Sequence, residues 1–237
     1  MSGKANVISP EPASIDRRSS RRAATRAEIV GAAWDLVREQ GLAGLSMRDL
    51  GDRVGMRAQS VYSYFASKDE IYDAMFREGY EQNVAWMAAE EVSDDVDPVD
   101  RVRAMAHRFF SFCTSDPVRY QLLFQRTIPG FVPSPESYAV ALESLRQMHA
   151  DFGRAGITDP EAADLATAVL TGLTSQQLAN DPGGDRWERL VDRAVTMTLR
   201  EVAPHLLADT PARKPSTTAR KTTTARKTST TTTRRSR

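Results

Sequence analysis

Residues 45–65 read LSMRDLGDRVGMRAQSVYSYF and predict two short helices joined by a tight turn. Ser46 is a good N-cap for the first helix, and Asp49, three residues later, can return the hydrogen bond as in a capping box. Gly55 supplies the permissive backbone that ends this helix. The stretch therefore predicts a helix, a turn near Gly55 and a second helix.

The second helix of this stretch has one apolar and one polar face. Val61 and Phe65 share the apolar face at i, i+4 spacing, whereas Gln59, Tyr62 and Ser63 share the opposite face. Donor and acceptor side chains of this kind are what reading of the DNA major groove requires, because base edges differ there in their donor and acceptor pattern. An ordinary solvated face has the same spacing, so the spacing alone leaves both interpretations open.

The order of residues from Thr25 to Met75 resembles the DNA-binding domain of TetR/AcrR-family transcriptional regulators. The shared features are a Ser that opens helix 2, a turn glycine followed by an apolar residue, an aromatic group that closes helix 3, and an SKDE sequence that opens helix 4. The residues at these positions are Ser46, Gly55, Met56, Tyr62, Tyr64, Phe65, Ser67, Lys68, Asp69 and Glu70. The resemblance implies an N-terminal helix-turn-helix domain that binds double-stranded DNA.

One position departs from the family pattern. The family often has Ser or Thr after the apolar residue of the turn, and this chain has Arg57, which cannot cap a helix by accepting a hydrogen bond. Arg57 is instead a candidate contact to phosphate or guanine. Lys68 is expected near DNA phosphate, although simple exposure remains an alternative. The expected DNA contacts are Ser46, Arg48, Arg57, Ala58, Gln59, Ser60, Tyr62, Ser63, Tyr64 and Lys68.

The two ends of the chain are basic. Residues 210–237 contain nine Lys or Arg and no acid, a charge of +9, whereas residues 1–209 carry 23 basic and 31 acidic side chains, a charge of −8. The Thr-rich tail is of low complexity, so we expect it to be disordered. It resembles the tails of chromosome-associated proteins and would add phosphate contacts without sequence preference. Docking of the tail on the acidic body is the alternative.

Residues 1–24 are rich in Ser, Pro, Ala and Arg and are expected to form a flexible basic arm. Such arms can reach a phosphate backbone or a minor groove, although a leader that only aids solubility has the same composition. The expected backbone contacts are Arg17, Arg18, Arg21 and Arg22.

The rest of the sequence predicts an all-α protein of about nine helices. The first helix is expected to open with a capping box of Thr25 and Glu28, and the fourth opens at Ser67. Later helices are expected over residues 99–114, 117–126, 136–155, 160–180 and 185–207, with a proline-rich loop at 128–135. We expect a DNA-binding domain over residues 25–70 and a helical-bundle domain over residues 71–209.

Residues 117–156 are similar to one type of C-terminal domain found among these regulators, a domain that usually binds a small molecule. The resemblance implies a pocket, and its candidate residues favour an apolar or aromatic ligand, although plain core packing is the alternative for each. The candidates are Trp86, Met105, Phe109, Phe112, Cys113, Phe124, Phe131, Tyr138 and Met148.

The same family dimerises through its last two helices, which pair as a four-helix bundle. The expected interface residues are Leu165, Val169, Leu173, Leu190, Ala194 and Met197. A two-fold dimer would hold two reading helices about one turn of DNA apart, so the operator is expected to be a palindrome.

The sequence lacks the signatures of disulfide-bonded proteins, membrane or secreted proteins, and enzymes. A single cysteine, Cys113, excludes an internal disulfide and fits a reducing compartment. There is no long apolar run for a membrane or a signal peptide, so we expect a cytoplasmic, nucleoid-associated protein. The histidines are scattered and no phosphate-binding glycine loop occurs, so no enzyme activity, metal or cofactor is expected.

Two functions remain. One is a dimeric repressor released from its operator by a small effector, and the other is an architectural, nucleoid-type DNA-binding protein dominated by the basic tail. The polar residues of the second helix favour the first.

Overall fold

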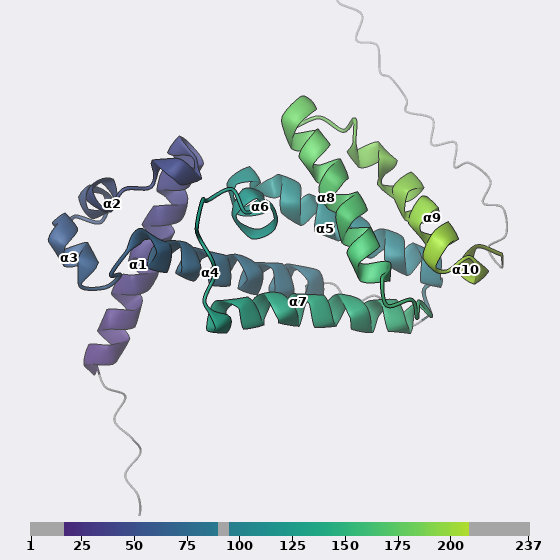
Figure 1. Ribbon diagram of the computed structural model, residues 1–237, viewed down its shortest axis with the longest axis horizontal. Helices are drawn as coiled ribbons and strands as arrows, with labels where there is room; N and C mark the ends of the chain where they lie inside the picture. The colour runs from purple at the N-terminus through teal and green to yellow at the C-terminus, as the bar shows by residue number, and fades with distance from the viewer. Residues whose placement is uncertain (1–16, 90–94, 209–237) are drawn as a thin grey trace, which may run out of the picture.

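The computed structural model describes residues 17–89 and 95–208, and this part of the chain is helical with no strand (Figure 1). The prediction of an all-α fold with about nine helices is therefore confirmed, with ten α-helices among the described residues. They are α1 (Arg17–Gln40), α2 (Met47–Arg53), α3 (Ala58–Tyr62), α4 (Lys68–Ala88), α5 (Pro98–Ser115), α6 (Pro117–Phe124), α7 (Pro135–Arg154), α8 (Ala162–Asn180), α9 (Val191–Val202) and α10 (His205–Ala208), with 3-10 turns at Leu42–Gly44 and Glu188–Leu190.

The first four helices share one apolar core. Val37 from α1, Leu50 from α2, Val61 from α3, Phe65 after it and Ile71 from α4 are all fully buried there. Because α4 starts in this core and continues into the body beside α7, it joins the N-terminal helices to the body (Figure 1).

The prediction for the start of α1 is wrong. The helix begins at Arg17, so Thr25 and Glu28 lie within it and do not form a capping box at its N-terminus. The residues before Thr25 are mostly Arg, Ser and Ala, and the Arg and Ala among them have a high helix propensity. They extend the helix backward from the packed part of α1. The rest of the expected basic arm, residues 1–16, lies outside the described residues.

The body contains a second core between α5, α7, α8 and α9. Buried residues from these helices include Phe110, Phe152, Ala163, Val195 and Leu199. Figure 1 shows α7 lying along α4 on one side, with α8 and α9 across α5 on the other. Hydrogen bonds join residue 73 to 134 and residue 83 to 144, so α4 and α7 run parallel.

The prediction of one continuous helix over residues 185–207 is also wrong. A 3-10 turn precedes α9, and α9 ends at Val202, where Ala203 leaves the helical conformation (φ −153, ψ 56). Pro204 follows, and because proline lacks the N–H that a continuing helix needs, α10 starts separately at His205. Along the described residues no helix is both long and apolar enough to cross a membrane.

Candidate nucleic-acid interface and internal cavity

Side-chain caps fix the start of α2. The backbone N–H of Asp49 donates to the Ser46 hydroxyl oxygen (3.1 Å), and the Ser46 hydroxyl donates to the Asp49 carboxylate (2.7 Å). Ser46 is therefore the N-cap that the sequence predicts. Since its hydroxyl is engaged in capping and its side chain is half-buried, Ser46 positions α2 and has little surface left for DNA.

Two glycines shape the turn between α2 and α3. Gly55 has φ +67, in the left-handed region that favours glycine, as the sequence predicts. Gly51 was missed by the sequence reasoning. A Cβ on Gly51 would lie 2.7 Å from the carbonyl oxygen of Met56, so only glycine lets α3 approach α2 this closely. The backbone N–H of Met56 donates to the Gly51 carbonyl at 2.8 Å, which closes the turn.

The polar side of α3 faces away from the core. Gln59, Ser60, Tyr62 and Ser63 are exposed, and the Tyr62 side chain keeps 47% of its surface accessible. Arg57 occupies the N-cap position without a side-chain capping bond and is exposed, as expected for a residue that cannot accept. The helix is only five residues long.

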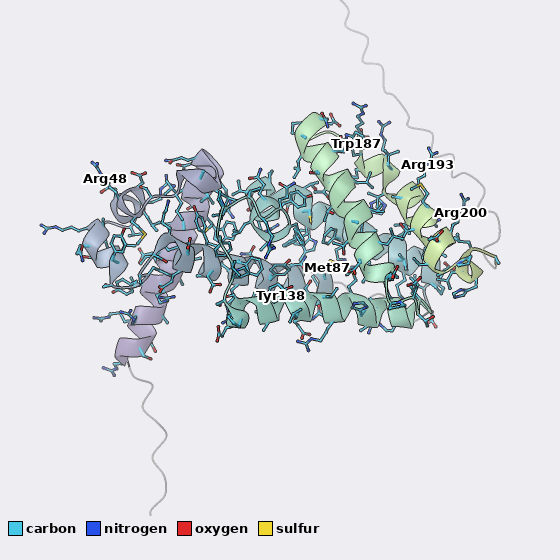
Figure 2. All side chains as sticks on the ribbon, in the orientation of Figure 1. Arg48, Met87, Tyr138, Trp187, Arg193 and Arg200 are labelled. Carbon is cyan, nitrogen blue, oxygen red and sulfur yellow. The ribbon has the colours of Figure 1, made fainter. Side chains whose placement is uncertain are left out.

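The other candidate contacts flank α3. Arg48 projects from α2 away from the body (Figure 2), and Lys68 is exposed in the first turn of α4. Ala58 and Tyr64 are half-buried. Because α2 and α3 pack together, we call the exposed residues Arg48, Gln59, Ser60, Tyr62 and Ser63 the candidate reading surface, and Lys68 follows it along the chain.

Two arginines of α1 hold the end of α3, which corrects part of the expected basic arm. Arg22 donates to the carbonyl oxygen of Ser63 (2.7 Å), and its guanidinium lies 5.0 Å from the centre of the Tyr64 ring. Arg26 donates to the carbonyl of Tyr64 and lies 3.9 Å from the centre of the Phe65 ring. Arg22 therefore supports the end of α3 instead of extending from a free arm.

The two remaining arginines of the arm whose side chains are described, Arg17 and Arg21, are exposed on α1. The Arg18 side chain lies outside the described residues. Arg26 was missed by the sequence reasoning, although its spacing of four residues from Arg22 places the two on one face of a helix.

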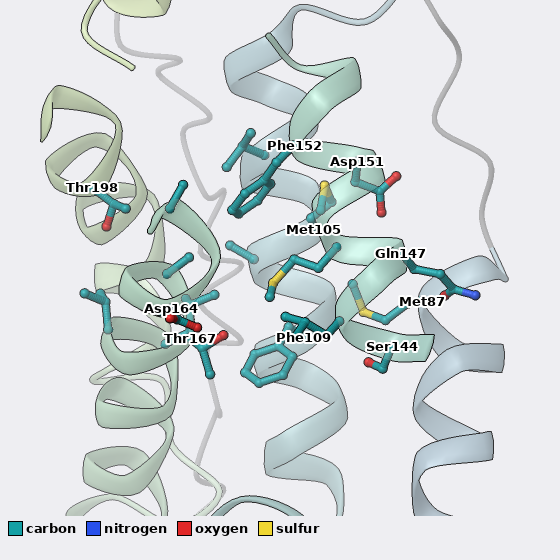
Figure 3. Close-up of a pocket in the computed structure, with 18 of the residues that line it drawn as sticks. Met87, Met105, Phe109, Ser144, Gln147, Asp151, Phe152, Asp164, Thr167 and Thr198 are labelled. Atoms are coloured by element: carbon teal, nitrogen blue, oxygen red, sulfur yellow. The ribbon is translucent and has the colours of Figure 1, made fainter. Parts of the chain in front are cut away.

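A cavity of about 280 Å³ lies among helices α4 to α9. Figure 3 shows Met105 and Phe109 of α5 between the side chains of α7 and those of α8. Five of the pocket candidates from the sequence line this cavity, namely Met105, Phe109, Phe124, Tyr138 and Met148.

The four other pocket candidates do not line the cavity. Phe112 and Cys113 are buried in a separate core cluster, and Arg119 lies 3.9 Å over the Phe112 ring. Trp86 is 43% exposed and donates to the carbonyl of Arg108. Phe131 packs edge-on against Tyr72 and Phe76 of α4. These side chains therefore stabilise packing between helices instead of bounding the cavity.

The sequence reasoning missed the cavity residues of α8 and α9, because it assigned these helices to dimerisation. Much of this wall is apolar, but polar groups occur at Asn83, Ser144, Gln147, Thr167 and Thr198. Among the described residues, the charged ones that line the cavity are Asp151 and Asp164, both acidic, and none is a Lys or Arg. An apolar ligand with few polar groups fits such a wall.

The expected interface residues fall into two groups. Leu165 and Met197 are large exposed apolar side chains, with 37% and 59% of their surfaces accessible. Figure 2 shows that Arg193 and Arg200 both project from the outer side of α9. Leu190, Val169 and Leu173 are half-buried, and Val169 also lines the cavity.

Ala194 is a correction to the expected interface. It is 7% exposed and lines the cavity, because it lies on the same inner face of α9 as Val191 and Val195. It is therefore turned away from any partner on the outer face.

Burial raises the pKa of the Cys113 thiol, and nearby Arg119 offsets only part of this rise. The thiol is thus protonated at neutral pH and packs as a small apolar group. Within residues 17–89 and 95–208, no group of three or more His, Cys, Asp or Glu side chains is arranged to hold a metal ion.

Comparison with known proteins agrees with this geometry. Residues 29–75 match the family of bacterial regulatory proteins called the tetR family. The HTH-type transcriptional regulator Rv1816 of Mycobacterium tuberculosis is 27% identical over 138 residues, which cover 53% of this chain and 54% of the relative. The chain thus spans about half the length of this relative.

Two solved structures show the same fold. One is a transcriptional regulator from Rhodococcus sp. Rha1, with a TM-score of 0.56, 22% identity, and coverage of 74% of this chain and 96% of the other. The second is the regulator FadR from Bacillus subtilis in complex with stearoyl-CoA, with a TM-score of 0.53, 16% identity, and coverage of 75% and 97%. With its helix-turn-helix and its helical body, the chain belongs to the TetR family of bacterial regulatory proteins.

Proposed function

We propose that this chain is a sequence-specific, DNA-binding transcriptional regulator that acts as a homodimer and represses until a small effector releases it from a palindromic operator. The observation that carries the proposal is the position of α4. Its first turn presents Lys68 beside the reading surface, and its later turns contribute Tyr80, Asn83 and Met87 to the cavity. One helix therefore touches both the nucleic-acid interface and the site for an effector.

The proposal divides the chain by role. Residues 25–70, with the preceding turns of α1, read DNA, and residues 71–209 bind the effector and dimerise. The exposed apolar side chains of Leu165 and Met197 support a partner on the outer face of α8 and α9. FadR, whose fold is similar, is solved with stearoyl-CoA, which supports a regulatory ligand in a body of this kind.

A change in α4 is the route by which an effector would act. An effector that binds one arrangement of α4 more tightly than another shifts the balance between them. In a dimer, the spacing of two α3 helices decides whether both reach the major groove of one operator. A small displacement of α4 at the cavity would thus weaken DNA binding. A regulator of this kind works in the cytoplasm on the nucleoid.

The test is selection of bound genomic DNA fragments by the purified full-length protein at about 150 mM salt, where exposed charges are well screened. We expect recovery of a short palindrome. Recovery of fragments with no shared sequence would overturn the proposal and favour an architectural DNA-binding protein governed by the basic tail.

A further inference from the structure

One polar atom in the wall of the cavity has no partner. Asn83 of α4 is 2% exposed and lines the cavity. Its side-chain oxygen accepts a hydrogen bond of 2.7 Å from the hydroxyl of Ser144 on α7. Its amide nitrogen, Nδ2, is buried and has no hydrogen-bond partner among the described residues. Native proteins pair nearly all buried donors, so this unpaired donor, on a residue that lines the cavity, is a candidate for a hydrogen bond to a ligand there.

The charges around the cavity limit what that partner can be. Asp151 and Asp164 are the charged lining residues, and Asp151 is already paired with Arg154. A ligand carboxylate or phosphate in the cavity would find no cation among the described lining residues to offset the loss of its hydration. A neutral acceptor oxygen, such as a carbonyl, needs only the amide donor.

We propose that Asn83 is the polar anchor of the effector site and that Nδ2 donates to the carbonyl oxygen of a neutral, mainly apolar molecule. This inference rests on the proposed function, which assigns the cavity to an effector, and it adds the chemical class of the ligand. The cavity of about 280 Å³ would hold a group of about ten non-hydrogen atoms, at roughly 30 Å³ for each as in liquid water.

The position of Asn83 on α4 would link a ligand bound to Nδ2 with the DNA-binding end of that helix. Ser144 orients the amide from α7, and the amide is carried by α4, so a ligand held by Nδ2 contacts the helix that leads to the reading surface. A ligand that lacks the carbonyl can still fill the cavity but does not make this bond.

The experiment compares two ligands that differ at one carbon atom. Valerophenone, a phenyl ketone, and pentylbenzene have the same framework, with a carbonyl in the ketone where the hydrocarbon has a CH₂ group. Displacement of the fluorescent dye N-phenyl-1-naphthylamine from the full-length protein gives both dissociation constants. Their ratio is measured in the wild type, Asn83→Leu and Asn83→Ala. Taking the change in this ratio between proteins cancels the different hydration of the two ligands.

Loss of the amide donor should shift the ratio against the ketone by about tenfold in both variants. Asn83→Ala removes the donor without adding a bulky side chain, so it remains informative if Asn83→Leu fails to fold. Asn180→Leu is the matched control, because Asn180 lies at the exposed end of α8 and does not line the cavity. It should keep the wild-type ratio.

The failures of the two proposals can be told apart. An unchanged ratio of dissociation constants in both Asn83 variants overturns the role of Asn83. The proposal of a DNA-binding regulator still stands in that case if the DNA selection recovers a palindrome. Tighter binding of 5-phenylpentanoate than of the ketone overturns the neutral class of ligand. If neither the dye nor the two ligands bind the wild type, the cavity takes no ligand of this kind, and the effector part of the proposed function fails with the inference.

Discussion

The carboxylate of Asp73 on α4 accepts two hydrogen bonds from Ser134, one from its backbone N–H at 2.6 Å and one from its hydroxyl at 3.0 Å. Ser134 is the N-cap of α7, and the hydroxyl of Ser137 in the first turn of that helix also donates to Asp73, at 2.8 Å. The start of α7 is therefore attached by three hydrogen bonds to α4, at a position between Lys68 and the cavity residues of that helix.

Asp73→Asn should weaken this connection. An amide cannot accept on both sides as a carboxylate does, so at least one of the three donors loses its partner. We expect the free energy of unfolding, measured by urea denaturation, to fall by about 1–3 kcal/mol. Asp52→Asn, at an exposed position of α2, should change it by less than about 0.5 kcal/mol. Equal losses in the two variants would show that the connection contributes no stability.

Arg26→Ala should loosen the end of α3. The substitution removes a charge-assisted hydrogen bond to the Tyr64 carbonyl and a contact with the Phe65 ring, so we expect a loss of about 2 kcal/mol in stability. Hydrogen exchange of the amides in residues 58–65 should become faster. Arg21→Ala, at an exposed position of the same helix, is the control. Unchanged exchange in Arg26→Ala would argue against the supporting role of Arg26.

Gln59→Ala should reduce binding to the selected operator without affecting the fold. Gln59 is exposed on the polar side of α3, and a lost base contact typically costs about 1–3 kcal/mol of discrimination. Operator and unrelated DNA should be compared at one salt concentration, with Gln40→Ala at the exposed end of α1 as the control. A similar loss of affinity for both DNAs would mean that Gln59 makes no base contact. Another residue would then read the base.

Removal of residues 210–237 should lower affinity for unrelated DNA and leave the base preference unchanged. The deletion takes away nine positive charges, so the dependence of binding on salt should become less steep because fewer counterions are released. Titrations of both proteins at several salt concentrations measure the two slopes. Equal slopes would contradict a DNA contact by the tail and favour its docking on the acidic body.

Cys113 should make stability fall at alkaline pH. The pKa of its thiol is raised by burial, so ionisation opposes folding. The contribution of the thiol is complete below the unfolded pKa of about 8.5, and it is lost above this pH by about 1.4 kcal/mol for each pH unit. Urea unfolding at pH values from about 7 to 10 should show a shallower decline for Cys113→Ala than for the wild type. Parallel declines would mean that the thiol ionises equally in both states.

The helix-turn-helix could be predicted from the sequence because its signals are local. The Ser46 cap, the turn at Gly55 and the burial of Val61 and Phe65 depend on residues within a few positions of one another, and the structure has all of them. The supporting contacts could not be predicted in this way. Arg26 reaches the carbonyl of Tyr64 across 38 positions of sequence, and nothing near Arg26 shows which backbone group it will meet.

The cavity also shows the difference between what local sequence predicts and what depends on tertiary packing. Phe109 and Phe112 lie one turn apart on α5, yet Phe109 lines the cavity and Phe112 is buried under Arg119. The sequence by itself determined that both face the interior, because an amphipathic helix buries its apolar side. Only the tertiary structure decided which interior surface remained unfilled, because a cavity arises where side chains from six different helices fail to meet, and no single helix carries that information.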